Sequence, residues 1–241
     1  RSSAASDVYK RQTCILKKCM CPFLCPYDAK RFEEFGIRKS IKVILSIFKN
    51  MGYSEDFIPD GMNAFERNVK RIGDCIIAGV LLLIFSPLFL ICYLVVKRED
   101  GGPAIFKQER VGRFGRPFYI YKFRSMRLDA ESMGPQLYKG GRDPRLTKVG
   151  KFLREHHLDE LPQLWNVFCG DMAFIGPRPE RKYFIERIVR KAPFYYLLHN
   201  VRPGITSLGM VKYGYAGSVD EMIERLEYDI LYYENMSLIL D

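Results

Sequence analysis

The stretch LLLIFSPLFLICYLVV, residues 81–96, is the most apolar part of the chain, and it carries a helix breaker at Ser86-Pro87. Proline removes a backbone donor and clashes with the preceding turn of a helix. The apolar run that contains this stretch, 75–96, is about 33 Å long as a straight helix, and a bilayer core needs roughly 30 Å. Length alone therefore permits a membrane helix, and the breaker predicts that it kinks or turns back at Ser86-Pro87.

Charges on both sides of the run favour a helix that turns back. Three basic residues precede it and two follow it: Arg67, Lys70, Arg71, Lys97 and Arg98. Basic flanks stay on the cytoplasmic side of a membrane, so one straight crossing would misplace one flank. A helix that enters, bends and returns satisfies both flanks, and Ser86 is a candidate partner for a carbonyl that Pro87 frees. A kinked single-pass anchor and a buried helix of a soluble protein are the alternatives that the residues leave open.

Positive charge is concentrated directly after this run. The chain carries 38 Lys and Arg against 28 Asp and Glu, and residues 97–154 alone hold 15 of the basic and 6 of the acidic side chains. Such a stretch suits anionic lipid, a phosphorylated small molecule or nucleic acid. Several of its arginines stand beside glycine or aromatic residues, and arginine forks suit phosphate oxygens. No helix-turn-helix, RNP-like or finger pattern accompanies the charge, so we do not expect a nucleic-acid partner.

The chain divides into three parts by composition. Residues 1–61 lack the order of the rest, and two interpretations are open: sequence foreign to the native protein, or a surface helix over 37–52. Residues 62–98 contain the apolar run, and 99–241 form the remaining domain. Seven cysteines follow no zinc-site spacing and suggest no disulfide framework, which favours a reducing, cytosolic setting.

The pattern over 99–241 predicts a few strands and several helices. Alternating apolar and basic residues, with glycines between them, predict two short strands and a turn over 104–126. The spacing of apolar residues and the positions of glycine and proline predict four helical segments, over 145–158, 159–170, 181–191 and 218–241.

Asp159-Glu160 is the most reactive pair that the sequence offers. It stands where a helix is expected to begin, with Pro162 still in the first turn. One interpretation is an N-cap, because an aspartate there accepts backbone N–H groups. The other is catalytic, because a helix N-terminus attracts phosphate, and a carboxylate beside bound phosphate is a candidate nucleophile or magnesium ligand. Arg154 lies five residues upstream, and Arg178 is held between two prolines in IGPRPE.

Several motifs follow one another between Met62 and Asp241. They are KRIGD (70–74), SP (86–87), GPAIFKQERVGRFGRPFYIYKFRSM (102–126), DPRLTKVGKFLREHHLDELPQLWNV (143–167), GDMAFIGPRP (170–179) and VRPGIT (201–206). On these motifs the chain resembles the bacterial sugar transferase family, the monotopic polyprenol-phosphate phosphoglycosyl transferases. No single motif identifies the family, whereas their number and order together do.

The resemblance implies a monotopic membrane protein, with a compact and mainly helical α+β catalytic domain on the cytoplasmic face of the bacterial inner membrane. It implies a re-entrant helix bent at Ser86-Pro87, with three residues at its base: Lys70, Arg71 and Asp74. The implied reaction moves a sugar-1-phosphate from a UDP-sugar to polyprenol (undecaprenyl) phosphate and releases UMP. This reaction starts a lipid-linked glycan such as exopolysaccharide, O-antigen or capsule.

The resemblance also implies roles for individual residues. Asp159 is similar to the nucleophile that takes up the phosphosugar covalently, and Glu160, with Asp159, to the residues that hold Mg²⁺. Arg154 and Arg178 match positions that bind phosphate. Three further residues within the matched motifs are candidates for binding phosphate or substrate: Lys122, Arg124 and Arg145. A covalent intermediate suits this chemistry, because two anionic phosphates repel each other and a two-step route avoids joining them directly.

This sequence departs from the family pattern in two places. After VRPGIT many members have a tryptophan and a Q-V-N run, whereas residues 207–215 are SLGMVKYGY, which leaves the donor sugar open. The family usually continues beyond ENMSLILD (234–241), so we expect further sequence after Asp241. Whether the protein forms a homo-oligomer is also open. The alternative function is a membrane-anchored basic scaffold that binds anionic lipid or polymer without chemistry.

Overall fold

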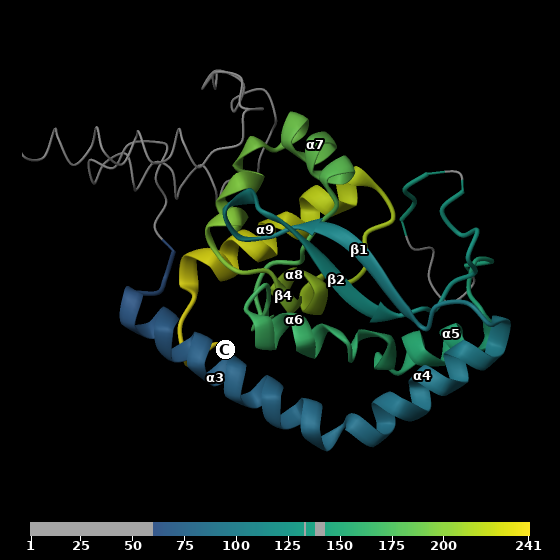
Figure 1. The fold of residues 1–241 in the computed structure, drawn as a ribbon. Helices are drawn as coiled ribbons and strands as arrows, with labels where there is room; N and C mark the ends of the chain where they lie inside the picture. Colours follow the sequence, from purple (N-terminus) through teal and green to yellow (C-terminus); the bar gives the residue numbers. More distant parts are fainter. Residues whose placement is uncertain (1–59, 133, 138–142) are drawn as a thin grey trace, which may run out of the picture. The chain divides into compact units, whose positions relative to one another are not determined.

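Two apolar helices, joined at an angle, open the part of the chain that the structure describes (Figure 1). Helix α3 spans Ala64–Ile84, helix α4 spans Ser86–Asp100, and the pair is bent by 64°. The structure is a computed structural model that describes three stretches: 60–132, 134–137 and 143–241. The interpretations of 1–61 therefore lie outside the described residues, except for the last two positions.

The break between the two helices follows from Pro87. In an unbroken helix the N–H of residue 87 would donate to the carbonyl of Leu83, and proline has no such N–H. The Ser86 hydroxyl donates to the Leu83 carbonyl at 2.8 Å instead, which confirms the expected contribution of Ser86. The predicted position of the bend is off by one residue: it lies at Phe85, because proline is tolerated in the first turn of a helix and Ser86-Pro87 therefore begin α4.

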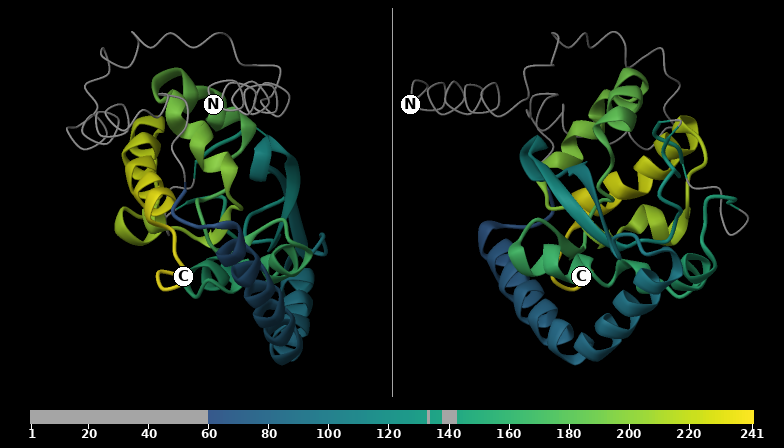
Figure 2. Two further views of the ribbon diagram at one scale, coloured as in Figure 1. Left: turned by 90° about the vertical axis from the view of Figure 1, so that its left-hand side faces the viewer. Right: turned by 45° about the vertical axis from the view of Figure 1, so that its right-hand side comes forward.

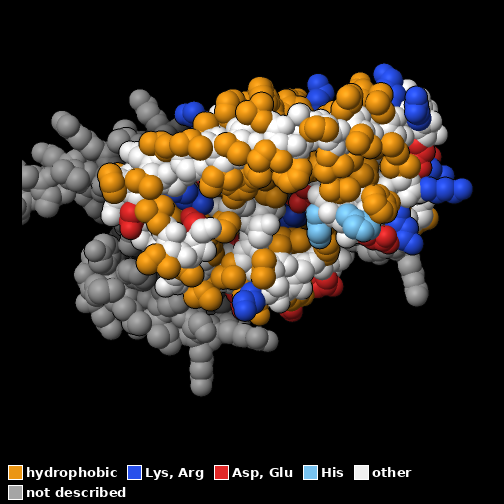
Figure 3. Space-filling view, turned by 90° about the horizontal axis from the view of Figure 1, so that it is seen from below, with side chains coloured by type: hydrophobic (Ala, Val, Ile, Leu, Met, Phe, Trp, Pro, Cys, Tyr) orange, Lys and Arg blue, Asp and Glu red, His pale blue; other side chains and the backbone are white. Residues whose placement is uncertain are grey.

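The bent pair presents a continuous apolar surface. Figure 3 shows it as an orange band across the face that α3 and α4 form. Eleven large apolar side chains of the pair are more than two-fifths exposed: Phe65, Ile72, Ile76, Ile77, Val80, Leu83, Ile84, Leu90, Ile91, Leu94 and Val95. Among the described helices, none is long and apolar enough to cross a membrane by itself, whereas α3 and α4 together meet that requirement by length and composition.

The two predicted strands are confirmed as an antiparallel hairpin. β1, Ile105–Val111, pairs with β2, Pro117–Phe123, along its full length. The turn between them contains the short 3-10 helix η2, Arg113–Gly115. Within it Phe114 adopts left-handed backbone angles (φ 59°), which are uncommon for a residue with a side chain.

The C-terminal part is mainly helical and lies on the inner side of the angle between α3 and α4 (Figures 1 and 2). Two short strands, β3 (Ala173–Ile175) and β4 (Gly204–Thr206), pair in parallel. The helical segments are α7 (Lys182–Lys191), η5 (Pro193–Asn200), α8 (Leu208–Lys212) and α9 (Val219–Asn235). The helices expected over 181–191 and 218–241 correspond to α7 and α9, and the mainly helical α+β class is confirmed.

Three short helices carry the carboxylate pair: α5 (Lys148–Glu155), η4 (Leu158–Glu160) and α6 (Gln163–Cys169). The expectation of one helix that begins at Asp159 is wrong, because α6 begins at Gln163 and Asp159 lies in a separate 3-10 turn. Pro162 has no N–H to donate, and the turn before it closes with a short-range bond of 3.3 Å from the Leu161 N–H to the Leu158 carbonyl.

Two buried clusters hold these elements together. One joins α4 to β2 and α5 through Cys92, Val96, Phe123 and Leu153. The other joins α3 to β2, α6 and the residues after α6 through Ala78, Ile120, Val167 and Met172. Both arms of the bent pair therefore pack directly on the strand and the helices that position the carboxylates.

Candidate active site

Asp159 lies at the centre of a buried polar cluster. His157 has left-handed backbone angles (φ 55°), and the η4 turn that follows leaves Asp159 only 4% exposed. The N-cap interpretation of Asp159 is wrong, because Pro162 is the N-cap of α6 and no side chain caps that helix. A buried carboxylate needs compensating partners, and the structure supplies them from other elements.

Two basic side chains face the carboxylate pair. Lys122, on β2, places Nζ 2.5 Å from Oε1 of Glu160. Arg154, on α5, places Nε 3.8 Å from Oδ2 of Asp159, and the same Nε donates to Oγ of Ser125 at 2.8 Å. The fold therefore brings Lys122, which is distant in sequence, to the cluster of Arg154, Asp159 and Glu160.

Arg178 joins the same cluster from the turn before α7. Its positive charge is one of the influences that lower the pKa of Glu160, and the charge of Glu160 in turn raises the pKa of Arg178 against the effect of burial. The guanidinium carbon of Arg178 lies 5.7 Å from the centre of the Tyr215 ring. Arg178, from a different element, thus adds a second arginine charge that acts on Glu160.

The turn that carries Arg178 is held from both sides. The Gly204 N–H donates to the Pro177 carbonyl at 3.0 Å, and Nη1 of Arg110 donates to the Pro179 carbonyl at 3.0 Å. Each proline also fixes its own φ angle. Contacts with β1 and β4 therefore fix the backbone on either side of Arg178. The position from which its side chain extends is fixed in the same way.

The two carboxyls have opposite electrostatic surroundings. Burial raises the pKa of Asp159, an effect that Lys122 opposes and Glu160 reinforces. Burial acts on Glu160 as well, but Lys122 and Arg178 outweigh it and hold the pKa of Glu160 at about 2. Glu160 is thus a fixed anion at neutral pH, whereas Asp159 is the more basic of the two and the better suited to act as a nucleophile.

Residues that the sequence analysis did not single out fix this geometry. Asn166, fully buried on α6, donates to the Tyr119 carbonyl at 2.7 Å and accepts from the Tyr121 N–H at 3.1 Å. Gly150, on α5, packs so closely on Ser125 that a Cβ would lie 2.0 Å from the Ser125 carbonyl oxygen. These contacts hold α6 and α5 against the second strand, and no local pattern reveals them because they join residues far apart in sequence.

Tyr215 is a further residue of the cluster that the sequence analysis missed. It lies between α8 and α9, within the stretch that departs from the family pattern, and it is 48% exposed. Burial raises the pKa of its hydroxyl, Arg178 opposes this, and the charges of Glu160 and Asp159 reinforce it. A half-exposed aromatic ring therefore lies beside Arg178, where the charges of both carboxylates act on it.

Two of the predicted phosphate-binding residues lie elsewhere. Arg124 pairs with Asp100 at the end of α4, and Arg145 pairs with Asp143 at 2.6 Å and donates to the Leu137 carbonyl at 2.9 Å. Within the described residues, no hydrogen bond or ion pair joins either arginine to the carboxylate pair. Their contacts fix the ends of loops, and phosphate binding by them stays a prediction.

The three residues expected at the base of the bent pair lie near the start of α3. Lys70 is 3.9 Å from Asp74 and 2.6 Å from Asp241, and so ties α3 to the end of the described chain. Arg71 donates to two carbonyls in the last turn of α6, each at 2.8 Å. A cation at a helix C-terminus is favourable, so this contact stabilises α6 on α3.

The carboxylate pair is the candidate place for a metal ion. Within the described residues, no group of three or more His, Cys, Asp or Glu side chains could hold a metal by itself. Mg²⁺, however, is commonly bound by one or two carboxylates together with water and substrate phosphates. Asp159 and the ionised Glu160 fit an ion of that kind, which a phosphate-bearing substrate would share.

Comparison with known proteins places this cluster in a family. The model of the bacterial sugar transferase family matches residues 65–241, which include nearly all of the bent pair and every residue of the cluster. The chain belongs to this family. The resemblance seen in the sequence motifs is therefore confirmed.

Three relatives of this bacterial sugar transferase illustrate the family. A UDP-N-acetylgalactosamine-undecaprenyl-phosphate N-acetylgalactosaminephosphotransferase of Aeromonas hydrophila is 44% identical over 94% of this chain and 52% of the relative. A UDP-glucose:undecaprenyl-phosphate glucose-1-phosphate transferase of Klebsiella pneumoniae is 40% identical over 75% of this chain and 39% of the relative. An undecaprenyl-phosphate galactose phosphotransferase of Salmonella typhimurium is 37% identical over 71% of this chain and 38% of the relative. The chain spans about half, or less, of their lengths, and their names share the acceptor but differ in the sugar.

Proposed function

We propose that this family member transfers a sugar-1-phosphate from a UDP-sugar to undecaprenyl phosphate, releases UMP, and so begins the synthesis of a lipid-linked polysaccharide. The observation that carries the proposal is the buried Asp159, which faces Arg154 at 3.8 Å and adjoins a Glu160 that Lys122 keeps ionised. The names of the relatives support the classes of donor and acceptor.

In the first step a carboxylate oxygen of Asp159 attacks the phosphorus that carries the sugar. A bond forms between that phosphorus and the carboxylate oxygen. The bond from the same phosphorus to the bridging oxygen of the diphosphate breaks, and UMP leaves with that oxygen and its electron pair. The raised pKa of Asp159 makes its carboxylate more basic, and Arg154 beside it compensates the charge that gathers on the phosphoryl oxygens.

In the second step a phosphate oxygen of undecaprenyl phosphate attacks the phosphosugar on Asp159. A diphosphate linkage forms, the bond to the carboxylate oxygen breaks, and Asp159 is regenerated as a carboxylate. The anionic phosphates of donor and acceptor never have to react with each other in one step, which is the advantage of a covalent intermediate.

The charged residues around Asp159 compensate phosphate charge. Arg154 and Arg178 offer planar guanidinium forks that match phosphate oxygens. Glu160, which Lys122 keeps ionised, is the candidate ligand for Mg²⁺ together with Asp159. When bound, Mg²⁺ supplies Lewis-acid stabilisation of the reacting phosphate.

We further propose that α3 and α4 enter the cytoplasmic leaflet of the bacterial inner membrane and return to the same side. The 64° bend, the band of exposed apolar side chains and the basic residues at both ends of the pair support this arrangement. The polyprenol acceptor carries its phosphate at the membrane surface, and the UDP-sugar arrives from the cytosol. A site on the inner side of the angle is accessible to both.

UMP release from a panel of UDP-sugars tests the proposed reaction. With the full chain in detergent and undecaprenyl phosphate present, we expect release from at least one of UDP-N-acetylgalactosamine, UDP-glucose and UDP-galactose, and loss of it in Asp159→Asn. Asp220→Asn is the matched control, because the Asp220 side chain is 72% exposed on the surface. Membrane binding without UMP release from any donor would overturn the proposal in favour of a basic scaffold.

A further inference from the structure

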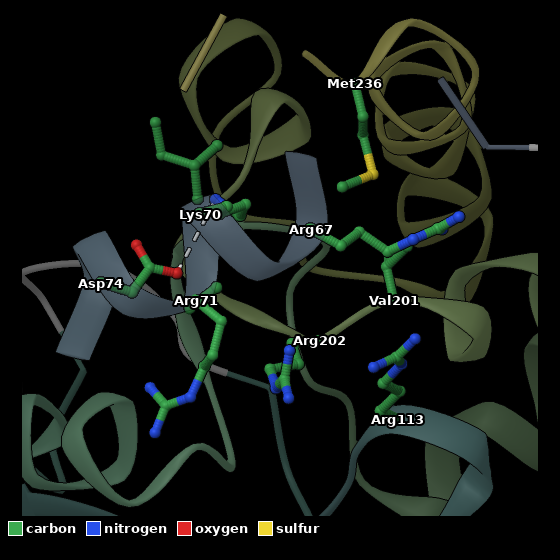
Figure 4. Close-up of a pocket in the computed structure, with 10 residues that line it drawn as sticks. Arg67, Lys70, Arg71, Asp74, Arg113, Val201, Arg202 and Met236 are labelled. Atoms are coloured by element: carbon green, nitrogen blue, oxygen red, sulfur yellow. Dashed lines mark ion pairs between the residues drawn. The ribbon is translucent and has the colours of Figure 1, made fainter. Parts of the chain in front are cut away.

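A small cavity lies at the foot of α3, apart from the carboxylate cluster (Figure 4). Its volume is about 30 Å³, which is room for a group about the size of one or two water molecules. Six charged residues line it: Arg67, Lys70, Arg71, Asp74, Arg113 and Arg202. They come from α3, from the hairpin turn and from the segment before β4, and none of them belongs to the Asp159 cluster.

Positive charge exceeds negative charge around this cavity. Asp74 is the one carboxylate among the lining residues, against five cations. Two further carboxylates pair with cations of the lining, Asp60 with Arg67 and Asp241 with Lys70. Three guanidinium groups form no ion pair within the described residues: Arg71, Arg113 and Arg202.

Main-chain carbonyls anchor these guanidinium groups. Nε of Arg113 donates to the Asn200 carbonyl at 2.9 Å, and Nε of Arg202 donates to the Gly170 carbonyl at 3.0 Å. In the part of the chain that the structure describes, their Nη groups have no hydrogen-bond partner, and both side chains line the cavity together with residues of α3 (Figure 4). Each guanidinium group is held in place through Nε and still has Nη groups that can donate hydrogen bonds. Such a group is pre-organised to bind an oxyanion.

The cations of the cavity also repel one another. Burial and the charge of Arg202 lower the pKa of Arg113, and burial and the charge of Arg71 lower the pKa of Arg202. Like charges that are held together in a partly buried site are stabilised by an anion between them. The cavity therefore has the donors and the uncompensated charge to receive an oxygen of an anionic group such as phosphate.

Exposed apolar side chains lie on the two elements that supply most of the charged lining residues, and Phe114 lies next to Arg113. Phe65 and Val69, on α3, are 74% and 39% exposed, and Phe114 at the hairpin turn is 47% exposed. The guanidinium carbon of Arg113 lies 4.5 Å from the centre of the Phe114 ring. Phe114 keeps this position with left-handed backbone angles, which cost energy for an aromatic residue. Apolar surface next to a phosphate receptor fits an anion that carries hydrocarbon chains.

We propose that this cavity binds the phosphate group of an anionic membrane lipid through Arg113 and Arg202. The lipid phosphate lies against the Nη groups, and the acyl chains pass the exposed ring of Phe114 on their way to the membrane. The bound lipid sets the depth and orientation of α3 in the membrane. This inference goes beyond the transferase reaction and does not depend on it.

Thermal unfolding of the full chain in neutral detergent tests the proposal. Dioctanoyl phosphatidylglycerol should raise the unfolding temperature in a concentration-dependent way, whereas dioctanoyl phosphatidylcholine and inorganic phosphate should not. The double variant Arg113→Gln/Arg202→Gln should bind phosphatidylglycerol roughly tenfold more weakly. Arg116→Gln is the matched control, because it removes an exposed charge from the same hairpin without touching the cavity.

Each alternative outcome is decisive. An equal response of the wild type and the double variant would overturn the assignment of the cavity. An equal loss in Arg116→Gln would show diffuse attraction to surface charge, and an equal response to inorganic phosphate would show a site for free anions; either result overturns a lipid site. Arg113→Gln alone, which leaves the Arg202 contact with Gly170 intact, covers the case in which the double variant does not fold. UMP release, measured separately, shows whether the transferase proposal holds.

Discussion

The carboxylate cluster around Asp159 and the cavity at the foot of α3 use basic side chains in opposite ways. In the cluster, Lys122 and Arg154 face carboxylates at 2.5 and 3.8 Å. In the cavity, Arg113 and Arg202 rest on main-chain carbonyls and have no ion-pair partner within the described residues. Both regions are rich in cations, but described carboxylates pair with most of the cations of the cluster and with fewer than half of those that line the cavity.

This difference distinguishes a site that binds and releases phosphate during a reaction from a site that keeps an anion bound. Where carboxylates already compensate the cations, a bound phosphate gains less than it would beside unpaired guanidinium groups, so products can leave. Where guanidinium groups are anchored and unpaired, a bound anion gains their full attraction. The account therefore assigns chemistry to the first region and binding alone to the second.

Asp159→Asn should have the largest effect, because it removes the nucleophile and keeps the size of the side chain. UMP release should fall by about three orders of magnitude or more, measured with the preferred UDP-sugar in detergent. Asp220→Asn should turn over like the wild type. If Asp159→Asn kept turnover close to that of the wild type, the carboxylate cluster would not be the catalytic site.

The two adjacent carboxyls should affect stability with opposite signs. The pKa of Glu160 is about 2 in the fold against an ordinary 4.5, so its charge contributes about 3 kcal/mol to the free energy of unfolding at neutral pH. This contribution is present above pH 4.5 and is lost as the pH falls towards 2. Glu160→Gln should therefore lower the free energy of unfolding by about that amount.

Asp159→Asn should raise the free energy of unfolding at neutral pH. Burial raises the pKa of Asp159, so folding favours its protonated form, and stability is lost as the pH rises through that pKa and the charge forms. Thermal unfolding of both variants in the same detergent shows whether each substitution raises or lowers the free energy of unfolding. A shift in the same direction for Asp159→Asn and Glu160→Gln would contradict the opposed surroundings of the pair.

Arg178→Lys should have a smaller effect, because it keeps the charge and removes the planar fork. We expect kcat/KM for the donor to fall roughly tenfold. Arg116→Lys, the same substitution at an exposed position, should leave kcat/KM unchanged. An unchanged kcat/KM in Arg178→Lys would show that Arg178 makes no forked contact with phosphate.

The pH dependence of UMP release should show the smallest effects. It should also shift in opposite directions in two variants of the cluster. The attacking Asp159 must be ionised, so kcat/KM should fall as the pH is lowered through its pKa, which lies above 3.8. Glu160→Gln removes a charge that raises this pKa and should move the acid limb to lower pH. Lys122→Met removes a charge that lowers it and should move the limb to higher pH. If the acid limb moved in the same direction in both variants, Asp159 would not be the group whose ionisation controls kcat/KM.

Local patterns predict the elements of this fold well. Alternation and glycines indicate the hairpin, and Ser86-Pro87 indicates the bend, because these signals depend on neighbouring residues. The position of the bend is off by one residue because proline begins a helix as readily as it breaks one. The start of α6 is wrong for a related reason, since Pro162 ends the turn that holds Asp159.

The geometry of the site is less predictable, because its contacts join distant segments. Lys122 and Glu160 meet across 38 positions, and Asn166 reaches a strand 47 positions earlier. The pairing of Arg113 with Asn200 spans 87 positions. Sequence motifs identify Asp159, Glu160, Arg154 and Arg178 as members of one family pattern, whereas Tyr215 and the cavity at the foot of α3 emerge only when the chain is folded.

Mass spectrometry of peptides tests the central claim most directly. The full chain is incubated with the preferred UDP-sugar in the absence of undecaprenyl phosphate. The account predicts that the peptide containing Asp159 gains the mass of the sugar phosphate less water, that undecaprenyl phosphate then removes this mass, and that Asp159→Asn never acquires it. UMP release that requires both substrates at once, with Asp159 unmodified throughout, would contradict a covalent intermediate on this residue.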